Sequence, residues 1–186
     1  MEKVFTKEEV MQRKEFFIEQ IKNGKTFFYP TDTVYGLGCD AFNKDSVKKI
    51  FELKKRGKNA VSVIAPNKQW IRDNCDLTEL YLDMIPGKYT LLVQPKKDLD
   101  LELVRQGSPL LGVRIPNNWF CDFLRENGFV FITTSANISG KKVCRSYEDL
   151  DKSIFDGVDF IIDDGKLESK ASTVLNALTG EIVREE

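Results

Sequence analysis

The alternation of strand-like and helix-like segments constrains the fold of this chain more than any other feature of its sequence. Apolar runs typical of buried strands recur at residues 25–29 (KTFFY), 61–65 (VSVIA) and 129–134 (FVFITT). Segments with helical spacing of apolar residues lie between them. Such alternation predicts the α/β class. Because several helices are short and some strands look paired in hairpins, we expect an open, twisted, mixed sheet with flanking helices.

Capping residues and chain breakers predict the bounds of the other elements. Thr6 and Glu9 fit a capping box, and the helix that they begin is expected to run to about Asn23, where Gly24 ends it. The remaining expected elements are loops at 30–38 and 135–140, a helix from Asp45, two short helices within 67–85, strands from Thr90 and over 110–115, a helix over 119–126, and strands at 159–163, 172–176 and near Ile182.

The chain contains no histidine, and this limits its chemistry. A Ser-His-Asp triad, a Cys-His dyad and a histidine-ligated metal are all excluded. The four cysteines, Cys39, Cys75, Cys121 and Cys144, form no Cys-x-x-Cys pair. We therefore expect reduced packing thiols and no metal site. Catalysis must use Lys, Arg, Ser, Thr, Asn, Tyr, carboxylates or backbone amides.

Length and charge narrow the class of protein further. The 186 residues fit a single domain over 1–186. A formal net charge of -1 argues against nucleic-acid binding as the main role, so any basic site must be local. No apolar run approaches a membrane span, and the charged N-terminal segment lacks the apolar centre of a secretory signal. We therefore expect a cytoplasmic protein without a membrane partner.

Three polar segments adjoin predicted strands, and loops at strand ends are where α/β proteins bind ligands. PTDTVYGLG (30–38) offers hydroxyls, a carboxylate and glycines that permit close backbone approach. The basic stretch 54–59 could clamp phosphate. TTSANISG (133–140) offers hydroxyls, an amide and backbone N–H groups that can bind an anion. Each segment also fits an ordinary role, as a polar turn or, for 54–59, as favourable charge at a helix end.

Two further features stand in predicted strands. Arg114 lies within the apolar run LLGVRIP, where burial is costly, so it either faces solvent or meets an anion. Ser172, Thr173 and Arg184 near the C-terminal end are unremarkable by themselves.

Taken together, these motifs resemble the YrdC/TsaC/YciO-like family. PTDTVYGLG, Lys54-x-Arg56, GVRIP, TSANISG and the late STV with Arg184 occur in that family's order and approximate spacing, over about 25–184. The resemblance implies the YrdC-like open sheet with a concave basic pocket. It also implies ATP-dependent synthesis of L-threonylcarbamoyladenylate from L-threonine and bicarbonate, with release of pyrophosphate, by a nucleotidyltransferase that uses ATP and Mg²⁺.

The same resemblance implies partners and residue roles. The product would pass to the tRNA-modifying threonylcarbamoyl transferase machinery, and weak tRNA binding would fit. Catalytic roles would fall on Lys54, Arg56, Ser135 and Asn137. ATP contacts would fall on Arg56, Asn59, Ser135, Asn137 and Arg184. Threonine contacts would fall on Thr33, Arg114, Thr133 and Ser172, with Arg114 meeting the threonine carboxylate.

Some residues depart from the family pattern, and other functions remain open at this point. Gly57 stands where the family usually has proline, and Lys88 takes the place of the second proline in Pro-Gly-Pro-x-Thr. A paralogue with a different or weaker activity is one alternative. The carbamoyl-adenylate chemistry of hydrogenase maturation is another, although it usually belongs to larger chains. A third is an RNA-binding module, which the net charge disfavours.

Overall fold

The computed structural model describes residues 3–55, 57 and 59–185. Its strands are β1 Val4–Phe5, β2 Phe27–Tyr29, β3 Gly36–Gly38, β4 Ser62–Ile64, β5 Cys75–Asp76, β6 Tyr89–Pro95, β7 Leu111–Arg114, β8 Phe131–Ser135, β9 Phe160–Ile162, β10 Thr173–Asn176 and β11 Ile182–Arg184. Its helices are α1 Lys7–Gln12, α2 Lys14–Lys22, α3 Lys44–Leu53, α4 Lys68–Asn74, α5 Glu79–Leu82, α6 Glu102–Arg105, α7 Trp119–Glu126 and α8 Lys152–Gly157, with a 3₁₀ turn at Tyr147–Asp149.

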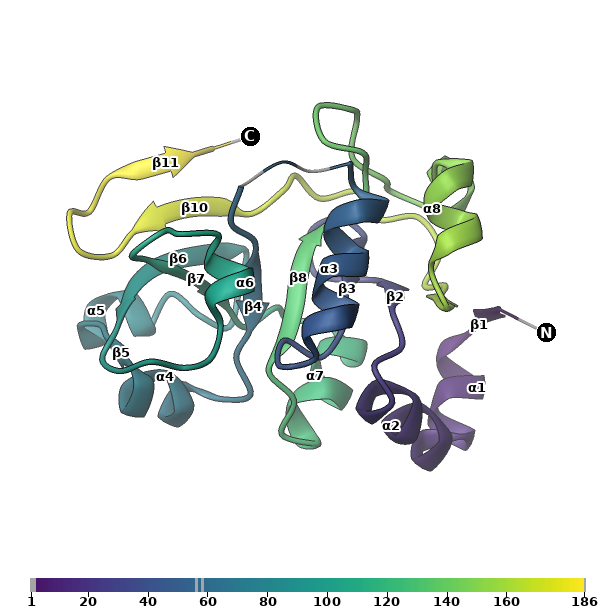
Figure 1. Cartoon of the computed structure of the whole chain (residues 1–186), viewed down its shortest axis with the longest axis horizontal. Helices are drawn as coiled ribbons and strands as arrows, with labels where there is room; N and C mark the ends of the chain where they lie inside the picture. The colour runs from purple at the N-terminus through teal and green to yellow at the C-terminus, as the bar shows by residue number, and fades with distance from the viewer. Residues whose placement is uncertain (1–2, 56, 58, 186) are drawn as a thin grey trace.

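Within these residues the strands form one sheet in the order β1-β9-β2-β3-β8-β4-β7-β6-β10-β11, and β5 pairs with β6 beside this path (Figure 1). The central pairs β2–β3, β3–β8, β4–β8 and β6–β7 are antiparallel. β4–β7, β6–β10 and β2–β9 are parallel. The expectation of an open, mixed α/β sheet is confirmed.

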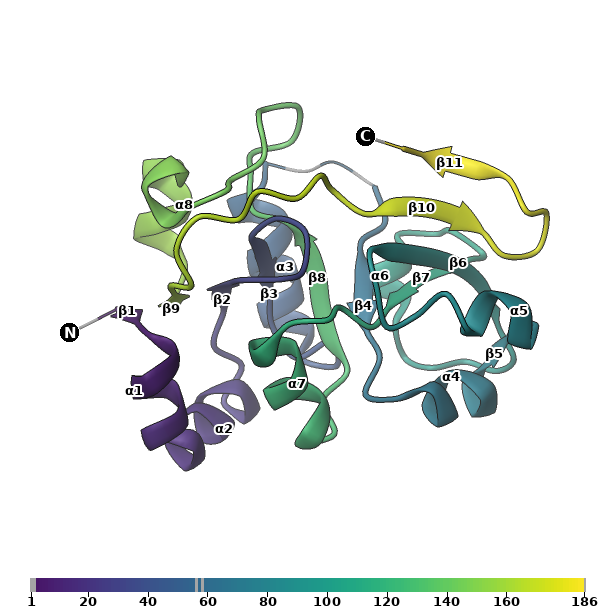
Figure 2. The same ribbon diagram turned by 180° about the vertical axis from the view of Figure 1, so that it is seen from behind.

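The two faces of the sheet are covered differently. Side chains alternate between faces along a strand, so Val63, Val113 and Ile132 point into one large cluster with residues of α3, α4 and α8. The opposite face carries Phe27 and Phe131, which pack in a second cluster with α1, α2 and α7. Figure 1 shows α3 and α6 in front of the sheet, and Figure 2 shows α7 in front of it from the other side. The second cluster covers only part of its face, and the rest carries the site.

The helix expected up to Asn23 is in fact two helices. The Thr6–Glu9 capping box is confirmed, but the backbone leaves the helical region at Arg13 (φ -118, ψ 35). The Arg13 guanidinium lies over the ring of Phe16, 4.5 Å from its centroid, and 5.4 Å from that of Phe5. Tertiary packing around Arg13 therefore accompanies a break that helical periodicity did not predict. Gly24 follows the second helix with φ +73, as expected.

The loop expected over 30–38 contains a strand. β3 occupies Gly36–Gly38 and pairs with β2 on one side and β8 on the other. A Cβ atom at Gly38 would lie 2.0 Å from the carbonyl oxygen of Ile132, so this close approach requires glycine. Glycine has low strand propensity, which is why the pattern predicted a loop. The short elements β1, β5, α6 and α8 were also not expected.

The cysteines and the apolar segments have ordinary packing roles. Cys39, Cys75, Cys121 and Cys144 are free and buried, as expected for packing thiols. Burial raises the pKa of the Cys144 thiol to about 11, so it stays protonated near neutral pH. In the described ranges no helix is both long and apolar enough to cross a membrane.

Candidate active site

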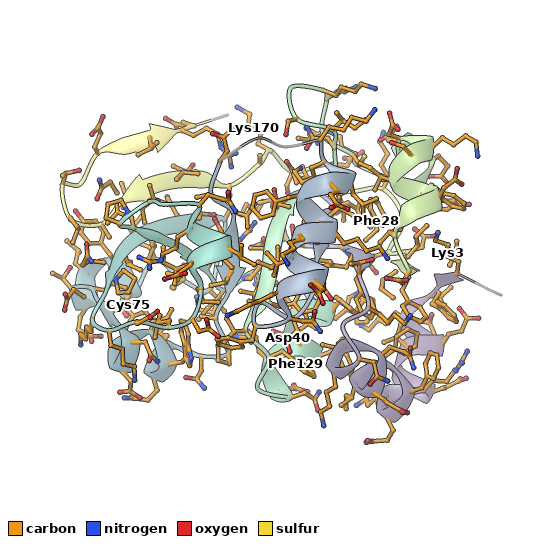
Figure 3. The ribbon with its side chains drawn as sticks, in the orientation of Figure 1. Lys3, Phe28, Asp40, Cys75, Phe129 and Lys170 are labelled. Carbon is orange, nitrogen blue, oxygen red and sulfur yellow. The ribbon has the colours of Figure 1, made fainter. Side chains whose placement is uncertain are left out.

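Two adjoining cavities open on the part of the sheet that the second cluster leaves uncovered. The larger has a volume of about 380 Å³ and the smaller about 320 Å³, and they share Ser135, Ala171 and Arg184. Ala171, which lines both cavities, directly follows Lys170 in the chain. Figure 3 shows Lys170 in the upper part of the molecule and Asp40 and Phe129 in the lower part. Alternate residues of five strands line the larger cavity: Ser62, Thr90, Leu92, Gly112, Arg114, Thr133, Ser135 and Val174.

Arg114 is a buried cation at the end of β7, where it lines the larger cavity. It is 6% exposed, and its Nη2 lies 2.7 Å from Oδ1 of Asp32. The other Asp32 oxygen accepts from the Asn117 backbone N–H at 3.1 Å. The Arg114 Nε has no hydrogen-bond partner within the described structure. A guanidinium with an unused buried donor is suited to binding an anionic ligand, because leaving such a donor unpaired is costly.

The hydroxyls of the 30–38 segment lie beside this guanidinium. Oγ1 of Thr33 is 3.4 Å from both Nη1 and Nη2 of Arg114. It is also 2.9 Å from Oγ1 of Thr31, which donates to the Val34 carbonyl at 2.7 Å. These short-range bonds hold the segment in one conformation. Thr33 therefore presents its oxygen next to the cationic end of the cavity.

Lys54 supports the loop that separates the two cavities. Lys54 stands at the C-terminal end of α3, as expected, but its side chain is buried (1% exposed) and is not a solvated charge. The ammonium donates to the carbonyl of Ser135 and, at 2.8 Å, to that of Asn137. The backbone N–H of Ser139 in turn donates to the Lys54 carbonyl at 3.0 Å. These hydrogen bonds connect the 135–140 loop to the end of α3. The positively charged Lys54 side chain also lines the smaller cavity.

The side chains of this loop are arranged by local hydrogen bonds. Ser135 Oγ donates to Asn137 Oδ1 at 2.6 Å, and Asn137 Nδ2 donates to the Ile138 carbonyl at 3.1 Å. Both residues line the smaller cavity together with Asn59 and Lys141. The turn presents a hydroxyl, an amide and backbone groups at the point where the cavities meet, which suits a phosphate-sized anion.

The far wall comes from β10 and β11. Ser172 is buried and its hydroxyl lies 2.9 Å from that of Thr90. Arg184 donates from Nη2 to the Ser172 carbonyl at 3.0 Å and lines both cavities. The guanidinium therefore stands between the two compartments with donors remaining for a ligand.

Tyr35 joins three parts of the site. Its hydroxyl donates to the Gly165 carbonyl at 2.7 Å and accepts from the Asp164 N–H at 2.8 Å. Its backbone carbonyl accepts from Ala136, and its ring stacks on Phe28 with 4.5 Å between centroids. Burial raises the pKa of the Tyr35 phenol, which keeps its proton available for the bond to Gly165. The sequence predicts this hydroxyl as one that the 30–38 segment offers to a ligand, but in the structure it bonds to the 164–165 backbone.

Nearly all the residues expected at the site meet around these two cavities. Thr33, Arg114, Thr133 and Ser172 line the larger one, Lys54, Asn59 and Asn137 line the smaller one, and Ser135 and Arg184 line both. Arg56 lies outside the described residues. Asp32 supplies the carboxylate expected in the 30–38 segment, but its pairing with Arg114 was not predicted from the sequence. Every charged residue among the described lining residues is basic.

Comparison with known proteins identifies the family. The Sua5_yciO_yrdC family model, described as telomere recombination, matches residues 19–185. The chain belongs to the Sua5/YciO/YrdC family. The resemblance expected from the motifs is thereby confirmed.

Several relatives of this Sua5/YciO/YrdC protein carry a common name. A Methanocaldococcus jannaschii protein, provisionally named threonylcarbamoyl-AMP synthase, is 33% identical over 176 residues, which cover 91% of this chain and 82% of its own. Threonylcarbamoyl-AMP synthase of Methylococcus capsulatus is 33% identical over 133 residues, covering 68% of this chain and 71% of its own.

A solved relative has a known amino-acid ligand. The crystal structure of P. abyssi Sua5 complexed with L-threonine matches 94% of this chain with a TM-score of 0.83 and 25% identity. This chain spans 54% of that Sua5 chain. The shared fold therefore corresponds to about half of the longer protein.

Proposed function

We propose that this protein is an L-threonylcarbamoyladenylate synthase, a nucleotidyltransferase that uses L-threonine, bicarbonate and ATP. The relatives named threonylcarbamoyl-AMP synthase and the threonine complex of P. abyssi Sua5 support this function. One observation carries the proposal. A buried guanidinium with an unused donor lies in one cavity, and a loop suited to phosphate lies where this cavity meets the next.

The larger cavity suits the amino acid. The Arg114 guanidinium would bind the threonine carboxylate in addition to Asp32, through donors that include the unpartnered Nε. Thr33, Thr133 and Ser172 would supply oxygens around the amine and side chain. A volume of about 380 Å³ is at the lower end of small-ligand sites, which span about 300–1,000 Å³.

The smaller cavity suits the nucleotide. Ser135, Asn137 and Asn59 line it, and Arg184 faces both compartments. The motif resemblance adds Arg56 to this group, although it lies outside the described residues. The buried Lys54 ammonium places positive charge beneath the loop, where the phosphates would lie.

The reaction fits a protein without histidine. The threonine amine attacks the carbon of bicarbonate, and loss of water gives an N-carboxy group. An oxygen of that carboxylate then attacks the α-phosphorus of ATP, and the bond from this phosphorus to the leaving pyrophosphate breaks. The attacking group is already an anion, so no imidazole base is required. The residues' work is to hold anions together and to stabilise charge on the phosphoryl oxygens. Arg114 would hold the amino-acid carboxylate, and Lys54 and Arg184 would supply positive charge near the phosphates.

Mg²⁺ would enter with ATP and not as a resident ion. Among the described residues that line the two cavities, none is a carboxylate. Nor do the described residues contain a group of three acidic or cysteine side chains that could hold a metal. Mg²⁺ is commonly bound through substrate phosphates and a small number of carboxylates. The donors that the described residues offer at the two cavities therefore fit a magnesium–nucleotide substrate.

The biological setting follows from the product. L-Threonylcarbamoyladenylate would be consumed by the machinery that transfers the threonylcarbamoyl group to tRNA, in the cytoplasm where its substrates are found. The basic residues near the cavities would allow weak tRNA contact. We also propose that residues 1–186 form a single domain, as expected from the length.

Product analysis tests the function. With ATP and Mg²⁺, pyrophosphate should appear only when L-threonine and bicarbonate are both present, and mass spectrometry should detect the threonylcarbamoyl adenylate. Reactions that omit one substrate at a time serve as controls. Equal pyrophosphate release without threonine would contradict the assignment and would favour a paralogue with another substrate.

A further inference from the structure

Ser62 lines the larger cavity from the sheet. It belongs to β4 and is paired with Gly112 of β7 on one side and Thr133 of β8 on the other. All three residues line the cavity. Because they share one row across the sheet, their side chains point to the same face. No motif drew attention to Ser62, since it lies within an otherwise apolar run.

The geometry around Ser62 leaves its hydroxyl available to a ligand. A Cβ atom on Gly112 would lie 2.4 Å from Ser62 Oγ, so the hydroxyl leans over the glycine and a larger residue there would collide with it. No residue of the described structure forms a hydrogen bond with this hydroxyl. The hydroxyls of Thr33, Thr90 and Ser172, in contrast, are each within hydrogen-bond distance of another protein group. Ser62 can therefore both donate to and accept from a bound molecule.

Arg114 relates this hydroxyl to the amino acid. Arg114 follows Gly112 by two residues on β7, so both project from the same face, and Ser62 is the diagonal neighbour of Arg114 across the β4–β7 pair. With strands about 4.8 Å apart and a rise of about 3.3 Å per residue, such neighbours lie about 8 Å apart. A threonine whose carboxylate meets the guanidinium can extend its side chain over Gly112. Leu92 and Val174 line the same cavity and offer apolar contact for a methyl group.

Resting on the proposed function, we propose that Ser62 binds the side-chain hydroxyl of the amino-acid substrate and so determines the preference for a β-hydroxy amino acid. A site that hydrogen-bonds a substrate hydroxyl discriminates against the analogue that lacks it, because the site's polar group is then left unpaired. Gly112 contributes by leaving room for both the serine side chain and the ligand above it.

Calorimetry with two ligands separates this role from a general effect on the pocket. L-Threonine and L-α-aminobutyrate differ by the hydroxyl alone, and each is titrated into the wild type and into Ser62→Ala. We expect the variant to bind threonine about tenfold more weakly, as for loss of one neutral hydrogen bond, and α-aminobutyrate with less than about a twofold change. The wild type should prefer threonine, and Ser62→Ala should lose most of that preference.

Ser108→Ala is the matched control. Ser108 lines the same cavity, but its hydroxyl already donates to the Leu110 carbonyl at 3.0 Å. Its removal should leave the ratio of the two affinities unchanged. If Ser62→Ala melts well below the wild type, Ser62→Cys provides a second variant of similar size with a weak donor.

The outcomes are distinct. Equal weakening of both ligands, or no change for either, would overturn the role of Ser62 while leaving threonine as the substrate. Failure of the wild type to bind threonine in the presence or absence of ATP would overturn the proposed function, and the assignment of Ser62 with it.

Discussion

At the scale of single residues, Arg114 connects the stability of the fold to ligand binding. Truncation to alanine would leave Asp32 buried without its partner, which typically costs about 3–5 kcal/mol. Arg114→Lys retains the charge but loses the planar fork and Nε. We expect this variant to bind threonine about 30-fold more weakly, equivalent to about 2 kcal/mol, because a lysine cannot bind a carboxylate in the bidentate manner. Calorimetric titration of threonine measures the change.

The affinity for a non-hydrolysable ATP analogue is the internal control for Arg114→Lys. Because Arg114 lines only the larger cavity, this affinity should stay within about twofold of the wild type, a difference smaller than one neutral hydrogen bond. Unchanged threonine affinity in a folded variant would assign Arg114 to the ion pair with Asp32 alone.

At the scale of elements, Lys54 joins the end of α3 to the 135–140 loop. Lys54→Met keeps the length of the side chain but removes the donors to the carbonyls of Ser135 and Asn137. We expect faster amide hydrogen exchange in the loop and a loss of turnover of roughly 100-fold or more, because both loop geometry and positive charge are lost. Exchange measured by mass spectrometry and pyrophosphate release report the two effects.

Lys48→Met is the matched control for the same helix. The Lys48 side chain is 60% exposed and pairs with nearby Asp45 at 3.4 Å, so its loss should alter neither loop exchange nor turnover. A folded Lys54→Met variant that keeps most of its turnover would show that this lysine has only a packing role.

At the scale of the whole molecule, the two apolar clusters share one sheet. Phe17 of α2 is fully buried among Phe5, Phe16 and Phe160, on the face opposite the large cluster. Phe17→Ala should lower the free energy of unfolding by about 3–5 kcal/mol through lost burial and a residual cavity. Since both clusters pack on the same strands, we expect a single cooperative transition in urea for the wild type and the variant.

Fluorescence and circular dichroism should give the same midpoint in that experiment. Two separate transitions, with only one of them shifted by Phe17→Ala, would contradict the expectation of a single domain over 1–186. Met11 offers a control on the neighbouring helix, because its side chain is 40% exposed and Met11→Ala should change stability by no more than about 1 kcal/mol.

Features that depend on neighbouring residues could be predicted from the sequence. The Thr6–Glu9 capping box joins residues three apart, and the alternation of strands and helices requires only local periodicity. The order of the polar motifs along the chain was likewise enough to indicate the family. These signals survive without knowledge of the fold because each is set by short-range sterics, hydrogen bonding or residue identity.

Contacts between distant residues were decided only by the tertiary structure. Arg114 and Asp32 are 82 positions apart, and Lys54 is 81 positions from Ser135. Strand periodicity predicts that alternate residues share a face, but not which face is covered by helices and which forms a cavity. The order of strands in the sheet brings β4, β7 and β8 together. That order places Ser62 beside Gly112 and brings alternate residues of these strands into the lining of one cavity.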